Sequence, residues 1–240
     1  MDNPKNTQGP QPKHLIATIK GWNIQRAREL IHKHPGLFSL VTQPEALASK
    51  VEEIQPQYIF FPHWSWIIPK RIYEAYECVV FHMTDLPFGR GGSPLQNLIS
   101  RGIYQTKISA IRVVKEIDAG PIYLKEDLSL HGCAEEIFIR ASEIIFQKMI
   151  PRLIQEKITP QPQQGQPTIF PRRRPEESDL TVTQGLQKLY DHIRMLDAEG
   201  YPPAYLETDR FRFEFNHALL RNGSIEAHVR IQEKKEDNNE

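Results

Sequence analysis

The sequence predicts an α/β fold in which a mostly parallel sheet has helices on both faces, followed by a small C-terminal α+β subdomain. Between residues 14 and 156, short apolar runs rich in β-branched and aromatic residues alternate with amphipathic stretches, which is the pattern of successive βα units. A segment rich in proline and glutamine follows at 159–168, and strand-like runs predominate beyond it. We therefore predict a main domain over 14–158, a linker over 159–168 and a subdomain over 169–231.

The elements of the main domain follow from hydrophobic periodicity. Continuous or alternating apolar runs predict strands, and apolar residues three and four positions apart predict helices. Tyr58–Phe61 is apolar throughout, as expected of a strand that is covered on both faces. Strands are expected over 15–19, 38–42, 58–61, 78–81, 107–116 and 122–124. Helices are expected after Gly21 and over 44–53, 71–76, 94–102 and 131–156.

The C-terminal subdomain has a different order of expected helices and strands. A strand edge over 169–174 is followed by a helix over 184–197, whose leucines and isoleucines recur at helical spacing, and by strands at 204–207, 211–215 and 226–230. From Pro171 onward the chain carries 11 Lys or Arg against 14 Asp or Glu. A slightly acidic segment is a poor ligand for polyanions, so we predict that it binds neither tRNA nor DNA.

Both ends of the chain are polar, and the composition is that of an ordinary globular protein. A leader over 1–13 and a tail over 232–240 are expected to be disordered. The leader lacks the apolar core of a signal peptide, and no apolar run approaches the roughly 20 residues that span a bilayer. Cys78 and Cys133 have no metal-ligand spacing, and 30 basic residues balance 30 acidic ones. These features predict a cytoplasmic protein with no metal, no membrane partner and no nucleic-acid partner.

One histidine follows a buried strand directly. The apolar run 78–81 leads to His82 and then to a loop rich in proline and glycine. In α/β sheets, ligands bind beyond the carboxyl ends of the strands, so a titratable residue at this position is well placed to meet a substrate. For His82 taken alone, an ordinary capping or core histidine is the alternative.

Asp118 gives His82 a potential partner. It follows the next predicted strand, 36 positions after His82. A histidine and an aspartate over one crevice could move protons, with the carboxylate orienting the imidazole. No Gly-x-Ser-x-Gly motif and no activated cysteine accompany them, so a covalent acyl-enzyme is not indicated. The nucleophile is therefore expected to come from the substrate.

Two other loops are candidate ligand sites. Pro62–Pro69 holds Trp64 and Trp66, which either stack on a flat ligand or simply anchor the next helix. The turn at 20–23 could bind a phosphate through the amides of the following helix. With one glycine and no Gly-x-Gly-x-x-Gly motif, a plain tight turn is favoured there.

The residues around His82 and Asp118 resemble those of the folate-dependent formyltransferases. The loop HMTDLPFGRGGSPLQ (82–96) and the run IDAGPI (117–122) are similar to the paired motifs of the glycinamide ribonucleotide, methionyl-tRNA and sugar-nucleotide members. The resemblance covers roughly residues 14–155. It implies a Rossmann-like formyltransferase fold and direct transfer of a formyl group from N10-formyltetrahydrofolate to a substrate amine, with tetrahydrofolate as the product.

The resemblance also implies roles for individual residues. His82 would stabilise the oxyanion that forms when the amine attacks, and Asp118 would orient His82 or relay protons. Val80 stands where the family normally has an asparagine that holds the formyl oxygen, so His63, Ser65 and Thr84 are candidate replacement donors. The pterin would be held largely through backbone groups of two segments. The implied cofactor-binding residues are Pro62, His63, Trp64, Ser65, Trp66, Ile67, Arg112, Val113, Val114, Glu116 and Ile117.

The acceptor is inferred from the C-terminal part. The runs FPRRRPE (170–176) and IRMLDAEGYPPAY (193–205) resemble sugar-nucleotide N-formyltransferases, in particular the type associated with pseudaminic acid pathways and the formylation domain of linear gramicidin synthetase. This implies a nucleotide-linked amino sugar as acceptor, such as a UDP-linked 4-amino-4,6-dideoxy sugar used in surface polysaccharide biosynthesis. The candidate substrate-binding residues are Lys20, Trp22, Asn23, Arg90, Gly91, Gln96, Phe170, Arg172, Arg173 and Arg174.

Several alternatives stay open at this stage. The three consecutive arginines either bind a diphosphate, which suits their planar donor groups, or form a solvated edge. A catalytically silent, formyltransferase-like binding domain is the second function class, because of Val80. A formyltransferase that acts on an aminoacyl or peptidyl amine is the third. The sequence also leaves a homodimer open.

Overall fold

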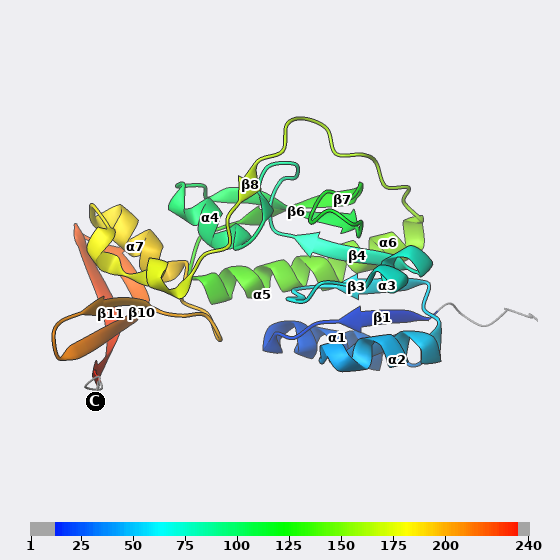
Figure 1. Ribbon diagram of the computed structural model, residues 1–240, viewed down its shortest axis with the longest axis horizontal. Coiled ribbons are helices and arrows are strands. Elements are labelled where there is room, and N and C mark those ends of the chain that lie inside the picture. The colour runs from blue at the N-terminus through cyan, green and yellow to red at the C-terminus, as the bar shows by residue number, and fades with distance from the viewer. Residues whose placement is uncertain (1–12, 235–240) are drawn as a thin grey trace, which may run out of the picture. The chain divides into compact units, whose positions relative to one another are not determined.

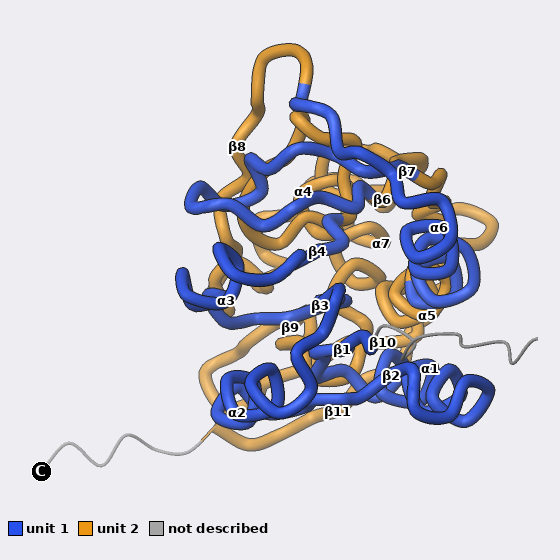
Figure 2. Tube along the Cα trace, turned by 90° about the vertical axis from the view of Figure 1, so that its right-hand side faces the viewer, with its two compact units in different colours: residues 1–82, 109–125, 142–163 blue, residues 83–108, 126–141, 164–240 orange. Residues whose placement is uncertain are grey.

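The computed structural model describes residues 13–234 (Figure 1). Most of the predicted leader and tail, at 1–12 and 235–240, therefore lies outside the described residues. The chain forms two compact units that interleave along the sequence (Figure 2). Unit 1 comprises residues 1–82, 109–125 and 142–163, and unit 2 comprises 83–108, 126–141 and 164–240. The domain boundaries proposed from composition stay a prediction.

Unit 1 is built on a six-stranded sheet with the strand order β2-β1-β3-β4-β6-β7. The strands are β1 (His14–Ala17), β2 (Phe38–Val41), β3 (Tyr58–Phe61), β4 (Glu77–His82), β6 (Gln105–Arg112) and β7 (Ile122–Ser129), of which β6 and β7 begin or end in unit 2. β1 pairs in parallel with β2 and β3, and β3 pairs in parallel with β4. β4 and β6 are antiparallel, with His82 opposite Ser109. The predicted α/β class and the mostly parallel sheet are confirmed.

Helices cover both faces of this sheet. They are α1 (Gly21–Lys33), α2 (Pro44–Ile54), α3 (Lys70–Ala75) and α6 (Ile150–Glu156). Because side chains alternate along a strand, Leu15 and Ile59 point to one face, where they pack with Leu47 of α2 and Ile72 of α3. On the opposite face, Figure 2 shows α1 and α6 across the strands from α2 and α3. The prediction of helices on both faces is confirmed.

The stretch predicted as one helix over 131–156 is helical from Ala134 to Glu156 but not uniform. It consists of α5 (Ala134–Ile144), a π-helical turn (Ile145–Met149) and α6. Pro151 has no backbone N–H, so a carbonyl one turn earlier loses its partner, and the wider turn accommodates this defect. Of the apolar residues expected on one side of this helix, Ile137, Ala141, Ile145, Met149 and Leu153 are buried, and Ile144 is half-buried.

Unit 2 contains the C-terminal α+β part. Helices α4 (Pro94–Ser100) and α7 (Leu186–Arg194) accompany an antiparallel sheet of β9 (Ala204–Glu207), β10 (Phe211–Arg221) and β11 (Ser224–Glu233). A short parallel pair joins β5 (Arg90–Gly91) to β8 (Ile169–Phe170). The predicted α+β subdomain is confirmed, with changes of boundary. The helix expected over 184–197 is Leu186–Arg194, and the strand expected over 211–215 extends to Arg221. The strand expected over 169–174 ends at Phe170, before Pro171, and β11 continues two residues beyond 231.

His14 is a buried histidine in the sheet of unit 1. Its ring lies among Phe38, Tyr58 and Phe60, with centroid separations of 5.4, 5.8 and 6.1 Å. Neither ring nitrogen has a hydrogen-bond partner among the described residues. Burial disfavours the charged form and lowers the pKa of His14 to about 4.

We expect His14 to make the protein less stable in acid. Between pH 6.5 and 4 the unfolded chain takes up a proton at this residue and the folded chain does not. The free energy of unfolding therefore falls by about 3 kcal/mol as the pH is lowered through that window. In His14→Phe this contribution disappears, and urea titrations at pH 7 and pH 4 measure it. His32→Phe, at an exposed position, is the control; equal pH dependence in His14→Phe and wild type would contradict the prediction.

Candidate active site

His82 and Asp118 meet in unit 1. His82 is the last residue of β4, and Asp118 lies in the loop between β6 and β7. The Nδ1 atom of His82 is 3.5 Å from an Oδ atom of Asp118, and the two side chains are only 9% and 14% exposed. A carboxylate at this position orients the imidazole ring. The structure thus brings together the two residues that the sequence offers for proton transfer.

A tight turn presents Asp118. Its backbone φ of +53° lies in the left-handed region, which is uncommon for residues other than glycine. Two residues later, a Cβ atom on Gly120 would lie 1.7 Å from the carbonyl oxygen of Arg112. The N–H of Arg112 also donates to the carbonyl of Pro121, at 2.9 Å. Only glycine fits this close approach, so the Asp-x-Gly motif is a turn held against the end of β6.

The loop after β3 is anchored by the loop after β1. The Thr18 hydroxyl and the Asn23 amide both donate to the carbonyl oxygen of Pro62, at 2.5 and 3.3 Å. Asn23, a predicted substrate-binding residue, is buried, and its Oδ1 has no hydrogen-bond partner among residues 13–234. The Trp64 ring packs 5.0 Å from that of Trp66. This loop is therefore held in place at its first residue.

His63 lies in the loop directly after β3 and contacts residues that follow β1. Its ring meets the ring of Trp22 edge-on at 6.0 Å, and Lys20 Nζ lies 5.6 Å from the Trp22 ring. Burial and the charge of Lys20 lower the pKa of His63 to about 4, so the imidazole is neutral at pH 7. The strand order reverses between β1 and β3, and such a switch point is where open α/β sheets bind ligands.

The two segments predicted to hold the pterin share one hydrophobic cluster. Trp64, Val80 and Val113 all pack against the core cluster that includes Phe61 and Cys78. The indole Nε1 of Trp64 is buried and has no hydrogen-bond partner in the described part of the chain. A buried donor without a partner is costly unless a ligand satisfies it. Val80, by contrast, offers no polar atom beside His82.

Each of these segments also exposes an apolar side chain. Ile67 is 88% exposed and Ile117 is 70% exposed. A flat heteroaromatic ligand has apolar faces and polar edges, so it could use both these exposed apolar groups and the buried indole N–H. The residues present therefore fit a pterin.

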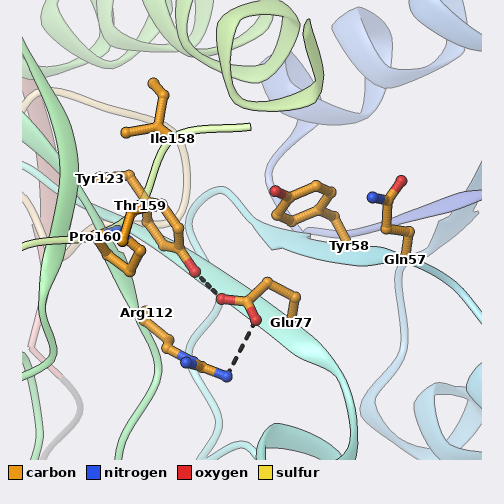
Figure 3. Close-up of a pocket in the computed structure, with 8 residues that line it drawn as sticks. All are labelled: Gln57, Tyr58, Glu77, Arg112, Tyr123, Ile158, Thr159 and Pro160. Atoms are coloured by element: carbon orange, nitrogen blue, oxygen red, sulfur yellow. Dashed lines mark hydrogen bonds and ion pairs between the residues drawn. The ribbon is translucent and has the colours of Figure 1, made fainter. Parts of the chain in front are cut away.

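Arg112 is engaged elsewhere. Its guanidinium pairs with Glu77 at 3.1 Å, and the Tyr123 hydroxyl donates to the other oxygen of Glu77 (Figure 3). The N–H of Arg112 is used by Pro121, and that of Val113 donates to the carbonyl of Cys78 at 2.9 Å. Of the second predicted pterin segment, this leaves the backbone donors of Val114, Glu116 and Ile117.

The same Glu77–Arg112 pair borders a polar cavity of about 420 Å³. The cavity lies at the starts of β3 and β4, whereas His82 is at the end of β4. It is lined by Gln57, Tyr58, Glu77, Arg112, Tyr123, Ile158, Thr159 and Pro160.

The remaining predicted site residues lie in unit 2, where glycines permit a close contact. β5 pairs with β8, and a Cβ on Gly91 would lie 2.5 Å from the carbonyl oxygen of Phe170. A Cβ on Gly92 would lie 2.6 Å from the Cα of Arg172. The two glycines thus allow the segment that begins at β8 to lie directly against the loop.

Several of these unit 2 side chains make structural contacts. Gln96 is buried and donates to the carbonyl of Met195 at 3.0 Å, and the Thr84 hydroxyl donates to the carbonyl of Gly89 at 3.3 Å. Phe170 is buried beneath the guanidinium of Arg101. Arg173 donates to the carbonyl of Glu177. These groups are already occupied within their own unit.

Arg172 and Arg174 differ from their neighbour. Both side chains are exposed, and neither forms an ion pair with another residue of 13–234.

Within the described ranges, no cluster of three or more His, Cys, Asp or Glu residues is placed to hold a metal ion. No helix of residues 13–234 has the length and hydropathy of a membrane span.

Gln163 is a residue that sequence reasoning missed. It lies in the predicted linker, yet its Nε2 donates to the carbonyls of Asp118 and Gly120 at 2.7 and 2.8 Å. A run of proline and glutamine carries no periodic signal, so only the tertiary contact identifies this residue.

The comparisons with known proteins agree on one chemistry. The family model described as the C-terminal domain of methionyl-tRNA formyltransferase matches residues 175–232. A methionyl-tRNA formyltransferase of Bacillus cereus is 30% identical over 184 residues, which are 72% of this chain and 57% of that protein. The chain thus spans about half the length of the curated relatives it matches.

Solved structures extend the comparison to most of the chain. The methionyl-tRNA formyltransferase from Clostridium thermocellum is 53% identical, with a TM-score of 0.91, over 93% of this chain and 100% of that one. HypX from Aquifex aeolicus in complex with tetrahydrofolic acid is 16% identical, with a TM-score of 0.69, over 90% of this chain and 40% of that one. At this lower identity the likeness concerns the fold alone.

Two predictions about the acceptor are wrong. The sugar-nucleotide acceptor, with its role in polysaccharide biosynthesis, conflicts with relatives at 30% and 53% identity that are named methionyl-tRNA formyltransferases. The motifs around His82 and Asp118 resemble those of formyltransferases with different acceptors, so they do not distinguish between acceptors.

The exclusion of a nucleic-acid partner is wrong on the same finding. That prediction was based on the net charge of the C-terminal part, and a net charge does not show which acidic side chains already form ion pairs with basic ones. Glu207, for example, is neutralised by Arg212 at 2.7 Å and by Lys234 at 3.1 Å. An acidic total can therefore coexist with exposed arginines that pair with nothing in residues 13–234.

The fold, the paired motifs and the identity over the full length of the Clostridium thermocellum protein lead to one conclusion. The chain belongs to the formyltransferase family.

Proposed function

We propose that this chain transfers a formyl group from N10-formyltetrahydrofolate to the α-amino group of methionyl-tRNA. The observation that carries the proposal is the 53% identity to a protein named methionyl-tRNA formyltransferase over that protein's whole length, together with the pair formed by His82 and Asp118. Among the acceptors considered from the sequence, an aminoacyl amine is the one that agrees with this name.

The bound folate supplies a formyl carbon whose oxygen gains negative charge as the amine attacks. A bond forms between the amine nitrogen and the formyl carbon, and the bond from that carbon to N10 breaks. The amine loses one proton and N10 gains one, so the reaction balances without an added oxidant or reductant. The chain must therefore stabilise an oxyanion and assist a proton transfer.

His82 performs both tasks in this proposal. Asp118 lies 3.5 Å from Nδ1 and orients the imidazole, which leaves Nε2 to donate to the developing oxyanion. Both side chains are nearly buried, and their interaction is stronger there than in bulk water. His63 or Ser65 supplies the second donor that Val80 lacks, since Thr84 already donates to Gly89.

The folate is held by the two loops of unit 1. Trp64 offers its buried Nε1, and Val114, Glu116 and Ile117 offer backbone groups. Ile67 and Ile117 cover the apolar faces of the pterin. The result of binding is that these exposed side chains lose their contact with water.

The experiment that tests the function is a formyl-transfer assay on the purified chain. N10-formyltetrahydrofolate is combined with methionyl-tRNA, phenylalanyl-tRNA, free methionine or a UDP-linked 4-amino sugar, and the formylated product is identified by mass spectrometry. We expect formyl-methionyl-tRNA and at most slow reaction with the other amines. Turnover of another amine, or of none, would overturn the proposed acceptor.

Arg172 and Arg174 are the proposed contacts with tRNA phosphates, because their exposed guanidinium groups pair with no other described side chain. We expect Arg172→Ala and Arg174→Ala each to raise KM for methionyl-tRNA. Each should also reduce, by about 1, the slope of the logarithm of the tRNA-binding constant against the logarithm of the salt concentration. Folate affinity should not change. Arg221→Ala, next to the turn between β10 and β11, is the matched control. If the salt slopes of all three variants equal that of wild type, these two arginines do not contact phosphate.

A further inference from the structure

Gln163 is the last residue of unit 1 and lies in an irregular segment that continues into unit 2. Residues 157–168 contain neither helix nor strand, and the segment is tied to the sheet by two backbone hydrogen bonds of 2.8 Å between Gln161 and Ile122. This bridge places Gln163 beside the loop that precedes β7. The segment is therefore a strap along that loop.

The amide of Gln163 holds one turn at two points. Its Nε2 donates to the carbonyl oxygen of Asp118 at 2.7 Å and to that of Gly120 at 2.8 Å. A primary amide has two N–H groups, so one side chain can satisfy both carbonyls. Within the turn itself, the Ala119 N–H donates to the carbonyl of Glu116 at a longer 3.3 Å. Much of the hydrogen bonding of this turn thus comes from a residue 45 positions away.

The turn needs such support because its backbone is unusual. Asp118 has a left-handed φ of +53°, which costs free energy unless the surroundings hold it. Gly120 is pressed against the carbonyl of Arg112 and fixes the far end of the turn. Gln163 and Gly120 together leave the Asp118 backbone little freedom. The direction of the carboxylate toward His82 follows from that backbone.

We propose that Gln163 is a positioning residue for formyl transfer, acting through the main chain of Asp118. The proposal rests on the function proposed above. Without the two hydrogen bonds, the carboxylate of Asp118 no longer keeps its 3.5 Å separation from His82 Nδ1. A misplacement of about 1 Å in a catalytic group can cost on the order of 100-fold in rate. Because Gln163 acts on the pair of His82 and Asp118 and does not contact the acceptor amine, its loss lowers kcat and leaves KM for the acceptor unchanged.

The test compares four variants with wild type. Gln163→Ala removes both donors, and Gln163→Glu keeps the shape but presents carboxylate oxygens to two carbonyls. Gln164→Ala, at the exposed neighbouring position, and Gln161→Ala, whose amide bonds only locally to Thr159 at 3.3 Å, are matched controls. We expect kcat to fall about 10- to 100-fold in both Gln163 variants, with KM within about twofold and the two controls unchanged.

A double-mutant cycle separates positioning from a general loss of structure. In an Asp118→Ala background, Gln163→Ala should reduce kcat no further, because the carboxylate through which Gln163 acts on His82 is already absent. Independent, additive effects would show that Gln163 acts elsewhere. A wild-type kcat in Gln163→Ala would overturn the proposal as well.

Hydrogen exchange gives a readout that needs no substrate. Amide exchange over residues 116–121 should be at least tenfold faster in Gln163→Ala than in wild type or Gln164→Ala, since the turn loses two hydrogen bonds. Unchanged exchange would overturn the positioning role even if kcat fell. If wild type formylates no amine, the proposed function fails, and the exchange measurement still decides whether Gln163 holds the turn.

Discussion

His82→Ala is expected to reduce kcat for formyl transfer by about 10²- to 10⁴-fold, the usual contribution of a positioned acid or base. The imidazole ends β4 and lies 3.5 Å from Asp118. Alanine removes the donor to the developing oxyanion, and Val80 offers no replacement beside it. The measurement is single-turnover formylation of methionyl-tRNA with saturating N10-formyltetrahydrofolate.

The control for this variant is a second histidine. His32 is exposed near the end of α1, and His32→Ala should keep the wild-type rate. Circular dichroism and urea unfolding establish that His82→Ala is folded. If folded His82→Ala retains more than a tenth of the wild-type kcat, His82 is not the residue that stabilises the oxyanion.

Arg194→Leu is expected to destabilise the protein by about 3–5 kcal/mol, the cost of removing one partner from a buried ion pair. Arg194 is 2% exposed. Its Nε donates to Asp191 at 2.6 Å, and Nη1 donates to the carbonyls of Leu130 and Gly132 at 2.6 and 2.8 Å. Leucine would leave a buried carboxylate and two carbonyls without their main donor. Urea unfolding at pH 7 measures the change in the free energy of unfolding.

An exposed ion pair provides the matched comparison. Arg152 pairs with Glu156 at 3.0 Å on the surface of α6, and Arg152→Leu should cost less than about 1 kcal/mol. In Asp191→Asn, the single amide oxygen can still accept from Arg194 Nε, while an NH2 group replaces the oxygen that accepts from the Tyr104 hydroxyl at 3.0 Å. Because Arg194 keeps its hydrogen bonds, the loss should be smaller than in Arg194→Leu. Equal costs for Arg194→Leu and Arg152→Leu would show that the buried network does not stabilise unit 2.

Local sequence patterns were sufficient to predict the helices and strands of the fold. The strand Tyr58–Phe61 and the helix that begins at Pro44 follow from periodicity over a few residues. Boundaries set by distant contacts were missed. The strand predicted over 107–116 ends at Arg112, where Gly120 and Pro121 fold back against it.

The acceptor shows another limit of sequence reasoning. The motifs at 82–96 and 117–122 resemble those of formyltransferases with different acceptors, so they do not identify the acceptor. The acidic total of the C-terminal part suggested no contact with tRNA, although it averages over acids that are already paired, such as Glu207. Relatives named for methionyl-tRNA corrected this interpretation.

The sequence by itself determined the α/β class, the placement of His82 at the end of a strand and the presence of Asp118 beyond the next one. These features depend on short-range periodicity and on the rule that ligands bind beyond the carboxyl ends of strands. Only the tertiary structure decided that Gly120 abuts Arg112, that the glycines at 91 and 92 make room for β8 and that Gln163 holds the Asp118 turn. Such contacts join residues tens of positions apart, and no local pattern in a single sequence records them.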